Sequence, residues 1–197
     1  PIISLVDNED KIDYFVCEMS SYQISTSPAV IPQIAVFLNY TPDHIDWHGS
    51  EEAYFEAKEA LFIDYRSPAW AILNACDPKV FDIRHKSLSN IISFGRELPG
   101  CSVYIKDNII VAKNKSKINE IISLSDVPLL GKHNYQNIMA AVAISNVVGI
   151  DKQIIKSTIA NFKPPEHRLE YVDIIDGIQY YNDSKATNCD STICALK

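Results

Sequence analysis

The sequence has no run of 18 or more apolar residues, which argues against a membrane-spanning helix. It also has no basic segment followed by an apolar one at its start, so we expect no signal peptide. Positive charge is scarce, because 18 Lys and Arg against 25 Asp and Glu give a net charge of -7. Binding to nucleic-acid phosphates needs clustered Lys and Arg, and no such cluster occurs. We therefore expect a soluble protein with neither a nucleic acid nor a membrane as partner.

Two short motifs are also missing. The five cysteines form no CxxC pair and no closely spaced Cys and His pattern, which argues against the common zinc sites and a disulfide framework. We expect reduced thiols, as in cytoplasmic proteins. No GxxxxGK[ST] phosphate loop occurs, because Gly131-Lys132-His133 lacks the earlier glycine and the hydroxyl residue. The chain by itself therefore has no evident cradle for the phosphates of a nucleoside triphosphate.

What is present predicts a globular α/β protein. The 197 residues are 47% hydrophobic and 22% charged, and short apolar runs alternate with longer helical patterns. This alternation is typical of a mainly parallel sheet flanked by helices. Strands are predicted at residues 13–19, 34–40 and 69–75. Glu18, Asn39 and Asn74 fall at their carboxyl ends, where ligands gather in open α/β sheets, although such residues can equally be ordinary loop starts.

Helices are predicted at residues 50–65, 131–150 and 151–162. Ser50 is the expected N-cap of the first, Gly149 ends the second, and Pro164-Pro165 follows the third. Short strand-like pieces between residues 88 and 128 predict a small antiparallel excursion, and residues 167–181 predict a hairpin that turns at Asp176-Gly177. The chain begins at Pro1 without Met, enters almost directly into a strand, and stops inside a predicted helix, STICALK. We therefore expect both ends to be cuts in a longer protein.

Two clusters have side chains that suit metal ions. Glu18 with Ser20 and Ser21 could hold Mg²⁺, or could be a solvated acid beside a serine N-cap. The segment NYTPDHIDWHGS contains two histidines and two aspartates, which is similar to a zinc site, but no cysteine or HExxH helix supports zinc. A phosphate-bridged magnesium with one imidazole ligand fits as well. The polar residues of this segment are Asn39, Asp43, His44, Asp46 and His48.

Each of three further sequence features has two possible interpretations. Lys58 lies in sequence reach of the histidines, but a lysine between alanines is most often a solvated surface charge. Asn134 and Asn137, with Gly131 and His133, could present amides to a heterocycle edge or act as helix caps. The third feature, which could bind phosphates and a ribose or form an ordinary polar turn, consists of His167, Arg168, Asp183, Ser184, Lys185 and Thr187.

The order of these segments resembles the Mur ligase family. EMSSYQI, NYTPDHIDWHGS, YFEAKEALF, GKHNYQN, HRLE and NDSKATN occur in the family's order between Cys17 and Ala195. The forms EMSSYQI and NDSKATN are similar to those of the member that adds D-glutamate. The resemblance implies a central ATP-binding domain at residues 1–180, without its phosphate loop, followed at 181–197 by a linker and the start of the C-terminal ligase domain.

The resemblance also implies a reaction and its residues. A cytoplasmic ligase would join D-glutamate to UDP-N-acetylmuramoyl-L-alanine through an acyl phosphate, using ATP and two Mg²⁺ ions, in peptidoglycan synthesis. Glu18 would ligate one Mg²⁺ and His44 the other, which a carbamylated Lys58 would support. The catalytic residues would be Lys58, His44 and Lys185, with Asn137, Arg168 and Asp183 at the nucleotide and Ser20 and Thr187 at the substrates.

Other interpretations remain open from the sequence. The chain could belong to another Mur ligase or a folylpolyglutamate synthetase, or it could be a noncatalytic remnant or an interaction domain. Because the phosphate loop is missing, we expect no ligase turnover from these 197 residues alone. An exposed sheet edge would favour aggregation of such a fragment. We expect the full-length protein to be a monomer.

Overall fold

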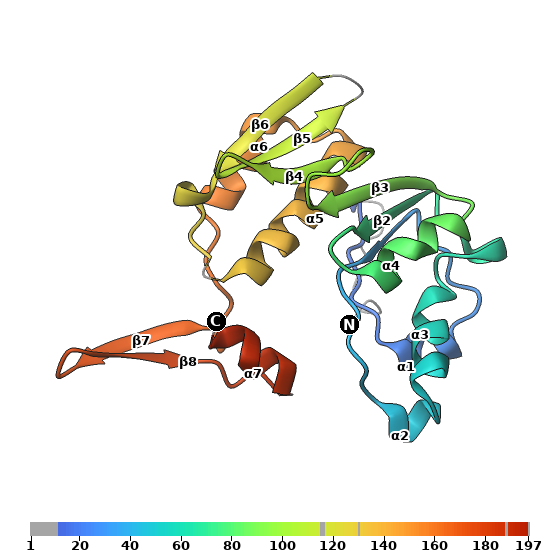
Figure 1. Ribbon diagram of the computed structural model, residues 1–197, viewed down its shortest axis with the longest axis horizontal. Coiled ribbons are helices and arrows are strands. Elements are labelled where there is room, and N and C mark those ends of the chain that lie inside the picture. The colour runs from blue at the N-terminus through green and yellow to red at the C-terminus, as the bar shows by residue number, and fades with distance from the viewer. Residues whose placement is uncertain (1–11, 115–116, 130, 188, 197) are drawn as a thin grey trace.

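The computed structural model describes residues 12–114, 117–129, 131–187 and 189–196, and its main feature is a six-stranded sheet (Figure 1). The strands are β1 (Ile34–Phe37), β2 (Trp70–Asn74), β3 (Asn90–Gly95), β4 (Val103–Lys106), β5 (Ile109–Asn114) and β6 (Lys117–Ser123). Their order in the sheet is β1-β2-β3-β4-β5-β6. Strands β1 to β4 pair in parallel, whereas β4, β5 and β6 pair antiparallel. The predicted α/β class with a mainly parallel sheet is therefore confirmed.

Two strand predictions need correction. The segment 13–19 forms no strand, and Val16 within it is 95% exposed. An apolar run becomes a strand only where another strand pairs with it, and no described strand does so here. The antiparallel excursion is also smaller than predicted, because β3 pairs in parallel with β2. The strand expected just after Pro1 lies outside the described residues.

The helices largely follow their predicted signals. Their bounds are α1 (Ser21–Thr26), α2 (Ile45–His48), α3 (Glu51–Glu59), α4 (Pro78–Asp82), α5 (Lys132–Val148), α6 (Lys152–Ala160) and α7 (Cys189–Ala195). Short 3-10 turns lie at η2 (Asp64–Arg66), η3 (Ile83–His85) and η4 (Leu124–Asp126). The Ser50 side chain accepts a hydrogen bond from the Ala53 N–H, and Gly149 ends α5 in a left-handed conformation, as predicted. Helix α3 ends at Glu59 rather than at residue 65, since the chain then turns to bury Leu61 and Phe62.

The sheet is buried on both faces, so the core forms two layers. In β2, Ala71 and Leu73 pack with α4 and the residues after α3, whereas Ile72 packs with α5 on the opposite face. Successive side chains of a strand point to opposite faces, which explains why β2 is apolar at every position between Trp70 and Asn74. Helix α5 covers one face and α3 and α4 lie toward the other (Figure 1).

The last strands form a separate hairpin. Strands β7 (Glu170–Ile175) and β8 (Ile178–Asn182) pair antiparallel and turn at Asp176-Gly177, as predicted. Both turn residues have positive φ, 52° and 81°, which a two-residue hairpin turn requires. The hairpin lies apart from the six-stranded sheet (Figure 1). In the described part of the chain, no helix has both the length and the apolar character needed to span a membrane.

Candidate functional site

The carboxyl ends of β1 and β2 border a cavity of about 370 Å³. Asn39 follows β1 and Asn74 ends β2, so the structure brings together two polar residues that the strand pattern predicts at this edge. Gln136, in the second turn of α5, also borders this open cavity. The remaining lining residues are Tyr40, Cys76, Asp77 and Pro78.

Asn74 organises this cavity although it is only 1% exposed. Its amide nitrogen donates to the Leu38 carbonyl oxygen at 2.6 Å and to Gln136 Oε1 at 3.1 Å. Its Oδ1 accepts from the Cys76 backbone N–H at 2.8 Å. Partial burial raises the pKa of the Cys76 thiol. Sequence reasoning missed Gln136, because only the packing of α5 against β2 gives it a partner.

The segment after β1 is fixed to the start of α4. The Tyr40 backbone N–H donates to Asp77 Oδ2 at 2.7 Å, while Asp77 Oδ1 caps α4 by accepting from the Val80 N–H. The Tyr40 hydroxyl donates to the Glu51 carbonyl oxygen at 3.0 Å. These bonds hold both ends of the NYTPDHIDWHGS segment, so its histidines have a defined location.

His44 and Lys58 both lie near the buried Tyr54 ring. The His44 ring centroid is 6.1 Å from that of Tyr54, and Lys58 Nζ lies 5.0 Å from the Tyr54 centroid and 6.0 Å from that of Phe37. Lys58 is half-buried, so it is not the fully solvated surface charge that its flanking alanines suggest. Burial lowers the pKa of Lys58, and the nearby Asp43 carboxylate acts in the opposite direction.

The histidine segment does not form a zinc site. His48 Nε2 lies 2.9 Å from Ser21 Oγ, and the His44 imidazole lies beside Asp43, with 3.7 Å between Nδ1 and Oδ1. Among the residues that the structure describes, no group of three or more His, Cys, Asp or Glu side chains could hold a metal ion. The zinc alternative, in which His, Cys, Asp or Glu side chains bind the metal, is therefore wrong for the described residues.

The segment before α1 has a local structural role. Ser20 Oγ accepts from the Gln23 N–H at 3.3 Å, and Gln23 Oε1 accepts from the Ser20 N–H at 2.8 Å. This reciprocal capping box corresponds to the N-cap alternative for the serines. Glu18 lies two residues earlier and is exposed, which leaves its carboxylate open to solvent.

Asn137 lies in the second turn of α5 and is exposed. Its amide nitrogen donates to Asn134 Oδ1 at 3.3 Å, one helical turn away, and its neighbour Gln136 lines the cavity. Gly131 precedes the helix with φ 89°, a conformation that favours glycine. The two asparagines therefore interact with each other on the exposed surface of α5 near the carboxyl ends of the strands.

The remaining predicted residues gather at the open end of the hairpin. The Leu169 N–H donates to Asp183 Oδ1 at 3.1 Å, and the Lys185 N–H donates to the His167 carbonyl oxygen at 3.1 Å. These two hydrogen bonds join residues 167–169 to residues 183–185. This end of the hairpin lies apart from the cavity edge of the sheet (Figure 1).

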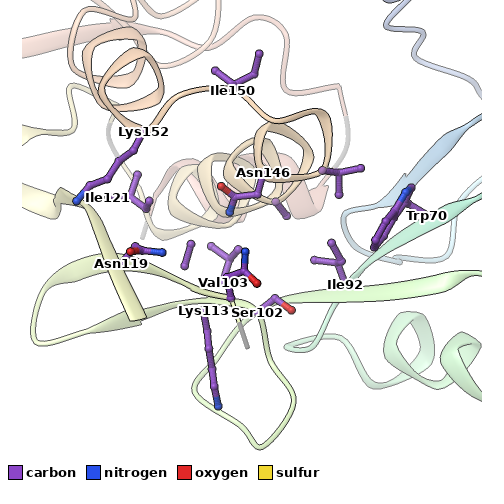
Figure 2. Close-up of a pocket in the computed structure, with 14 residues that line it drawn as sticks. Trp70, Ile92, Ser102, Val103, Lys113, Asn119, Ile121, Asn146, Ile150 and Lys152 are labelled. Carbon is purple, nitrogen blue, oxygen red and sulfur yellow. The ribbon is translucent and has the colours of Figure 1, made fainter. Parts of the chain in front are cut away.

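A larger cavity of about 540 Å³ lies at the opposite edge of the sheet, where β2 and β4 begin (Figure 2). Trp70 and Ile92 border it on the sheet, and Asn146 and Lys152 border it from α5 and α6. None of the predicted site residues lines it. A candidate site chosen by cavity volume alone would therefore miss the residues whose chemistry suits a reaction.

Comparison with known proteins places the chain in a family. A family model for the Mur ligase middle domain matches residues 3–145. Three curated relatives, each called a UDP-N-acetylmuramoylalanine–D-glutamate ligase, align over all of this chain: 38% identical in Acidobacterium capsulatum, 36% in Clostridioides difficile and 35% in Thermoanaerobacter sp. (strain X514). The chain spans 43 to 44% of the length of these relatives.

Solved structures agree in fold. A crystal structure of MurF from Acinetobacter baumannii matches 87% of this chain and 38% of its own, with a TM-score of 0.66 and 22% identity. MurC from Thermotoga maritima, a UDP-N-acetylmuramate-alanine ligase, matches 90% of this chain and 39% of its own, with a TM-score of 0.64 and 18% identity. Because the family model covers well over half of the sequence and the curated relatives align along all of it, the chain belongs to the Mur ligase family.

Proposed function

We propose that this chain is the central, ATP-binding part of a ligase that joins D-glutamate to UDP-N-acetylmuramoyl-L-alanine in peptidoglycan synthesis. The observation that carries the proposal is the alignment of the whole chain with relatives that bear the name of that ligase, at 35 to 38% identity. The structures of MurF and MurC are too distant in sequence to favour another amino acid. A cytoplasmic, monomeric enzyme is part of the same proposal.

The proposed reaction has two steps. The carboxylate of UDP-N-acetylmuramoyl-L-alanine attacks the γ-phosphorus of ATP, and ADP leaves as an acyl phosphate forms. The amine of D-glutamate then attacks the acyl carbon, loses a proton, and phosphate leaves as the amide forms. Negative charge develops in both steps, so cations that are already in place would lower the barrier.

In this reaction, several residues of the chain would each have a separate role. Lys185 would stabilise the charge of the acyl phosphate, and Arg168 would oppose the nucleotide phosphates. Asp183 would accept from the ribose, and its hydrogen bond from the Leu169 N–H orients the carboxylate for this. Asn137 would contact adenine next to the cavity at the carboxyl ends of the strands. Ser20 and Thr187 would contact the substrates.

The proposed magnesium ions would need ligands besides the described side chains, because no group of three or more His, Cys, Asp or Glu among these side chains could hold a metal ion. Mg²⁺ prefers oxygen ligands, so Glu18 is a suitable donor for one ion, whereas an unmodified lysine beside His44 is unsuitable for the other. Lys58 becomes suitable when its neutral amine attacks CO₂, forming an N–C bond and releasing a proton to leave a carbamate anion. The lowered pKa of Lys58 favours this reaction because it increases the fraction of neutral amine. When bound, Mg²⁺ would offset the charge of the ATP phosphates.

The test is amino-acid-dependent phosphate release by the intact gene product. With ATP, Mg²⁺ and UDP-N-acetylmuramoyl-L-alanine, we expect release with D-glutamate and not with L-alanine, a diamino acid or a dipeptide. Release with one of the others would identify a different Mur ligase, and glutamate-dependent release with a folate would indicate a folylpolyglutamate synthetase. No release under any of these conditions would favour a noncatalytic domain.

Substitution of Lys58 tests the proposed site. We expect Lys58→Ala to reduce the rate at least about a hundredfold, the upper range for residues that support a catalytic metal, and added bicarbonate not to restore it. Lys156→Ala is the matched control, because Lys156 is an exposed lysine on α6. Incubation with ¹³C-bicarbonate should give a carbamate NMR signal in the parent and not in Lys58→Ala. Equal rates for Lys58→Ala and the parent would contradict the assigned role.

A further inference from the structure

We infer that the hydrogen bond between Ser21 and His48 holds His44 in place for the proposed magnesium site, which makes Ser21 and His48 positioning residues. The inference rests on the function proposed above, in which neither residue otherwise has a task. It follows from a series of contacts that begins in the core and ends at His44.

His44 has a backbone conformation that needs external support. Its φ of 53° lies in the left-handed region, which is unfavourable for residues other than glycine. Such a conformation persists only where the surrounding structure fixes it. The His44 side chain makes no capping hydrogen bond to α2, so its own helix end does not supply this support.

Helix α2 cannot supply it alone either. It has four residues, none of them buried, and isolated helices of this length are unstable in water. The His44 carbonyl oxygen accepts from the Trp47 N–H at 3.2 Å and from the His48 N–H at 3.1 Å. Whatever fixes α2 therefore also fixes His44.

His48 attaches α2 to α1 through a hydrogen bond, in addition to the contact between the Trp47 and Tyr22 rings, whose centroids are 4.6 Å apart. Its Nε2 lies 2.9 Å from Ser21 Oγ, and its ring stacks on Tyr22 with 5.6 Å between centroids. Its ring centroid is also 5.2 Å from that of Tyr54. The hydrogen bond gives this contact a direction that ring packing alone does not give.

Ser21 is a firm anchor because α1 is tied to the core. Ser21 is 2% exposed and Ile24, one turn later, is 5% exposed. The buried Arg66 donates to the carbonyl oxygens of Ile24 and Ser27 at the end of α1, each at 3.3 Å. Lys58 lies on α3, so the bond between Ser21 and His48 helps to set the position of His44 relative to Lys58, together with the ring contacts of His44 with Tyr22 and Tyr54.

The first test is the His44 imidazole signal in a ¹H–¹³C NMR spectrum of the intact, metal-free protein labelled at histidine. We expect Ser21→Ala and His48→Phe to shift this signal, because both remove the hydrogen bond between Ser21 and His48. His48→Phe keeps a ring for Tyr22 and removes the hydrogen bond, whereas His48→Gln keeps a group that can bond to Ser21. We therefore expect His48→Gln to restore the parent signal in part.

The second test is the Mg²⁺ concentration that gives half of the maximal ligation rate. We expect Ser21→Ala to raise it about fivefold, the factor that corresponds to one hydrogen bond, with a smaller change in the KM for D-glutamate. Ser25→Ala is the matched control, because Ser25 lies on the same helix and its hydroxyl donates only to the Ser21 carbonyl oxygen at 2.9 Å. We expect this control to leave both readouts unchanged.

Each outcome decides the inference. A folded Ser21→Ala protein with the parent His44 signal and the parent Mg²⁺ requirement overturns it, as does an equal response of Ser25→Ala. If Ser21→Ala does not fold, His48→Phe and His48→Gln provide the same comparison. If the parent protein shows no ligation, the proposed function fails, while the His44 signal still decides whether Ser21 and His48 position that residue.

Discussion

At the scale of single residues, burial changes the pKa of a side chain and therefore its chemistry. Lys58 and Lys156 are both helical lysines, but Lys58 is half-buried among aromatic rings and Lys156 is exposed. Burial disfavours the charged form, so it lowers the pKa of Lys58. The unfolded chain then binds the Lys58 proton more tightly than the folded protein, and this difference destabilises the fold at neutral pH.

We expect Lys58→Met to increase the free energy of unfolding at neutral pH in buffer free of CO₂, although it removes activity. The gain should shrink as the pH rises toward the ordinary lysine value of 10.5, because the parent then no longer keeps the proton in the unfolded state. Urea unfolding at several pH values measures this, with Lys156→Met as the exposed control. A gain that stays constant over the whole pH range would contradict the expectation.

Gly95 packs closely against two residues that line the cavity, Asn74 and Cys76. Its φ is 124°, and a Cβ there would lie 2.8 Å from both Asn74 Oδ1 and Cys76 Sγ. We expect Gly95→Ala to destabilise the protein by about 2 kcal/mol through strain and the clash. Gly100→Ala is the control, because Gly100 also has positive φ but open space around its Cβ position. Thermal unfolding should show the larger loss for Gly95→Ala, and equal losses would mean that the clash is relieved by small shifts.

At the scale of elements, α3 is held at its end by a buried acid. Glu59 is 6% exposed, and both of its carboxylate oxygens accept from Lys86 Nζ, at 2.9 and 3.1 Å. Lys86 itself is largely exposed, so solvent reduces the strength of the pair. The pair ties α3 to the end of η3 and so helps to fix the helix that contains Lys58.

We expect Lys86→Ala to cost about 1 to 3 kcal/mol of stability, because it leaves a buried carboxylate without its partner. Lys79→Ala is the matched control, since Lys79 pairs with the exposed Glu51. An exposed pair is worth roughly 0.5 kcal/mol, so this change should be small. Chemical denaturation measures both. A loss for Lys86→Ala no greater than that for Lys79→Ala would show that Glu59 finds water or another donor.

At the scale of the whole molecule, the chain consists of a packed sheet-and-helix body and a hairpin with exposed apolar faces. Ile174 and Ile178 on the hairpin are 49% and 60% exposed, whereas Ile72 in β2 is fully buried. An exposed apolar surface of this kind usually marks an interaction site or an aggregation hazard. The hairpin also contains the segment with Asp183 and Lys185 at its open end.

We expect the 197-residue polypeptide, expressed by itself, to bind a hydrophobic dye and to release no phosphate under ligation conditions, since it contains no GxxxxGK[ST] loop. Ile174→Thr with Ile178→Thr should weaken dye binding and change the unfolding temperature little. Ile72→Ala, in the core, should cost about 2 to 5 kcal/mol. Ligase turnover by the isolated polypeptide would contradict the expectation, as would a large stability loss from the hairpin changes.

The sequence by itself determined the α/β class, where three of the helices begin and the hairpin turn, because these depend on local chemistry. Caps and turns act over only a few residues, as at Ser50, Gly149 and Asp176-Gly177. Strand β2 is apolar because both of its faces are buried. The order of the motifs also indicated the Mur ligase family, which the family model confirms. The roles of Glu18, Lys185 and the other candidate site residues stay predictions.

Only the tertiary structure decided the pairing of segments that are distant in the chain. Residues 13–19 are as apolar as a strand but pair with no strand that the structure describes, and α3 ends early because Leu61 and Phe62 enter the core. Gln136 meets Asn74, and His48 meets Ser21 rather than joining His44 in a zinc site. Such contacts depend on how helices pack on the sheet. Residue type and spacing do not specify that packing, because the same polar side chain can find several partners.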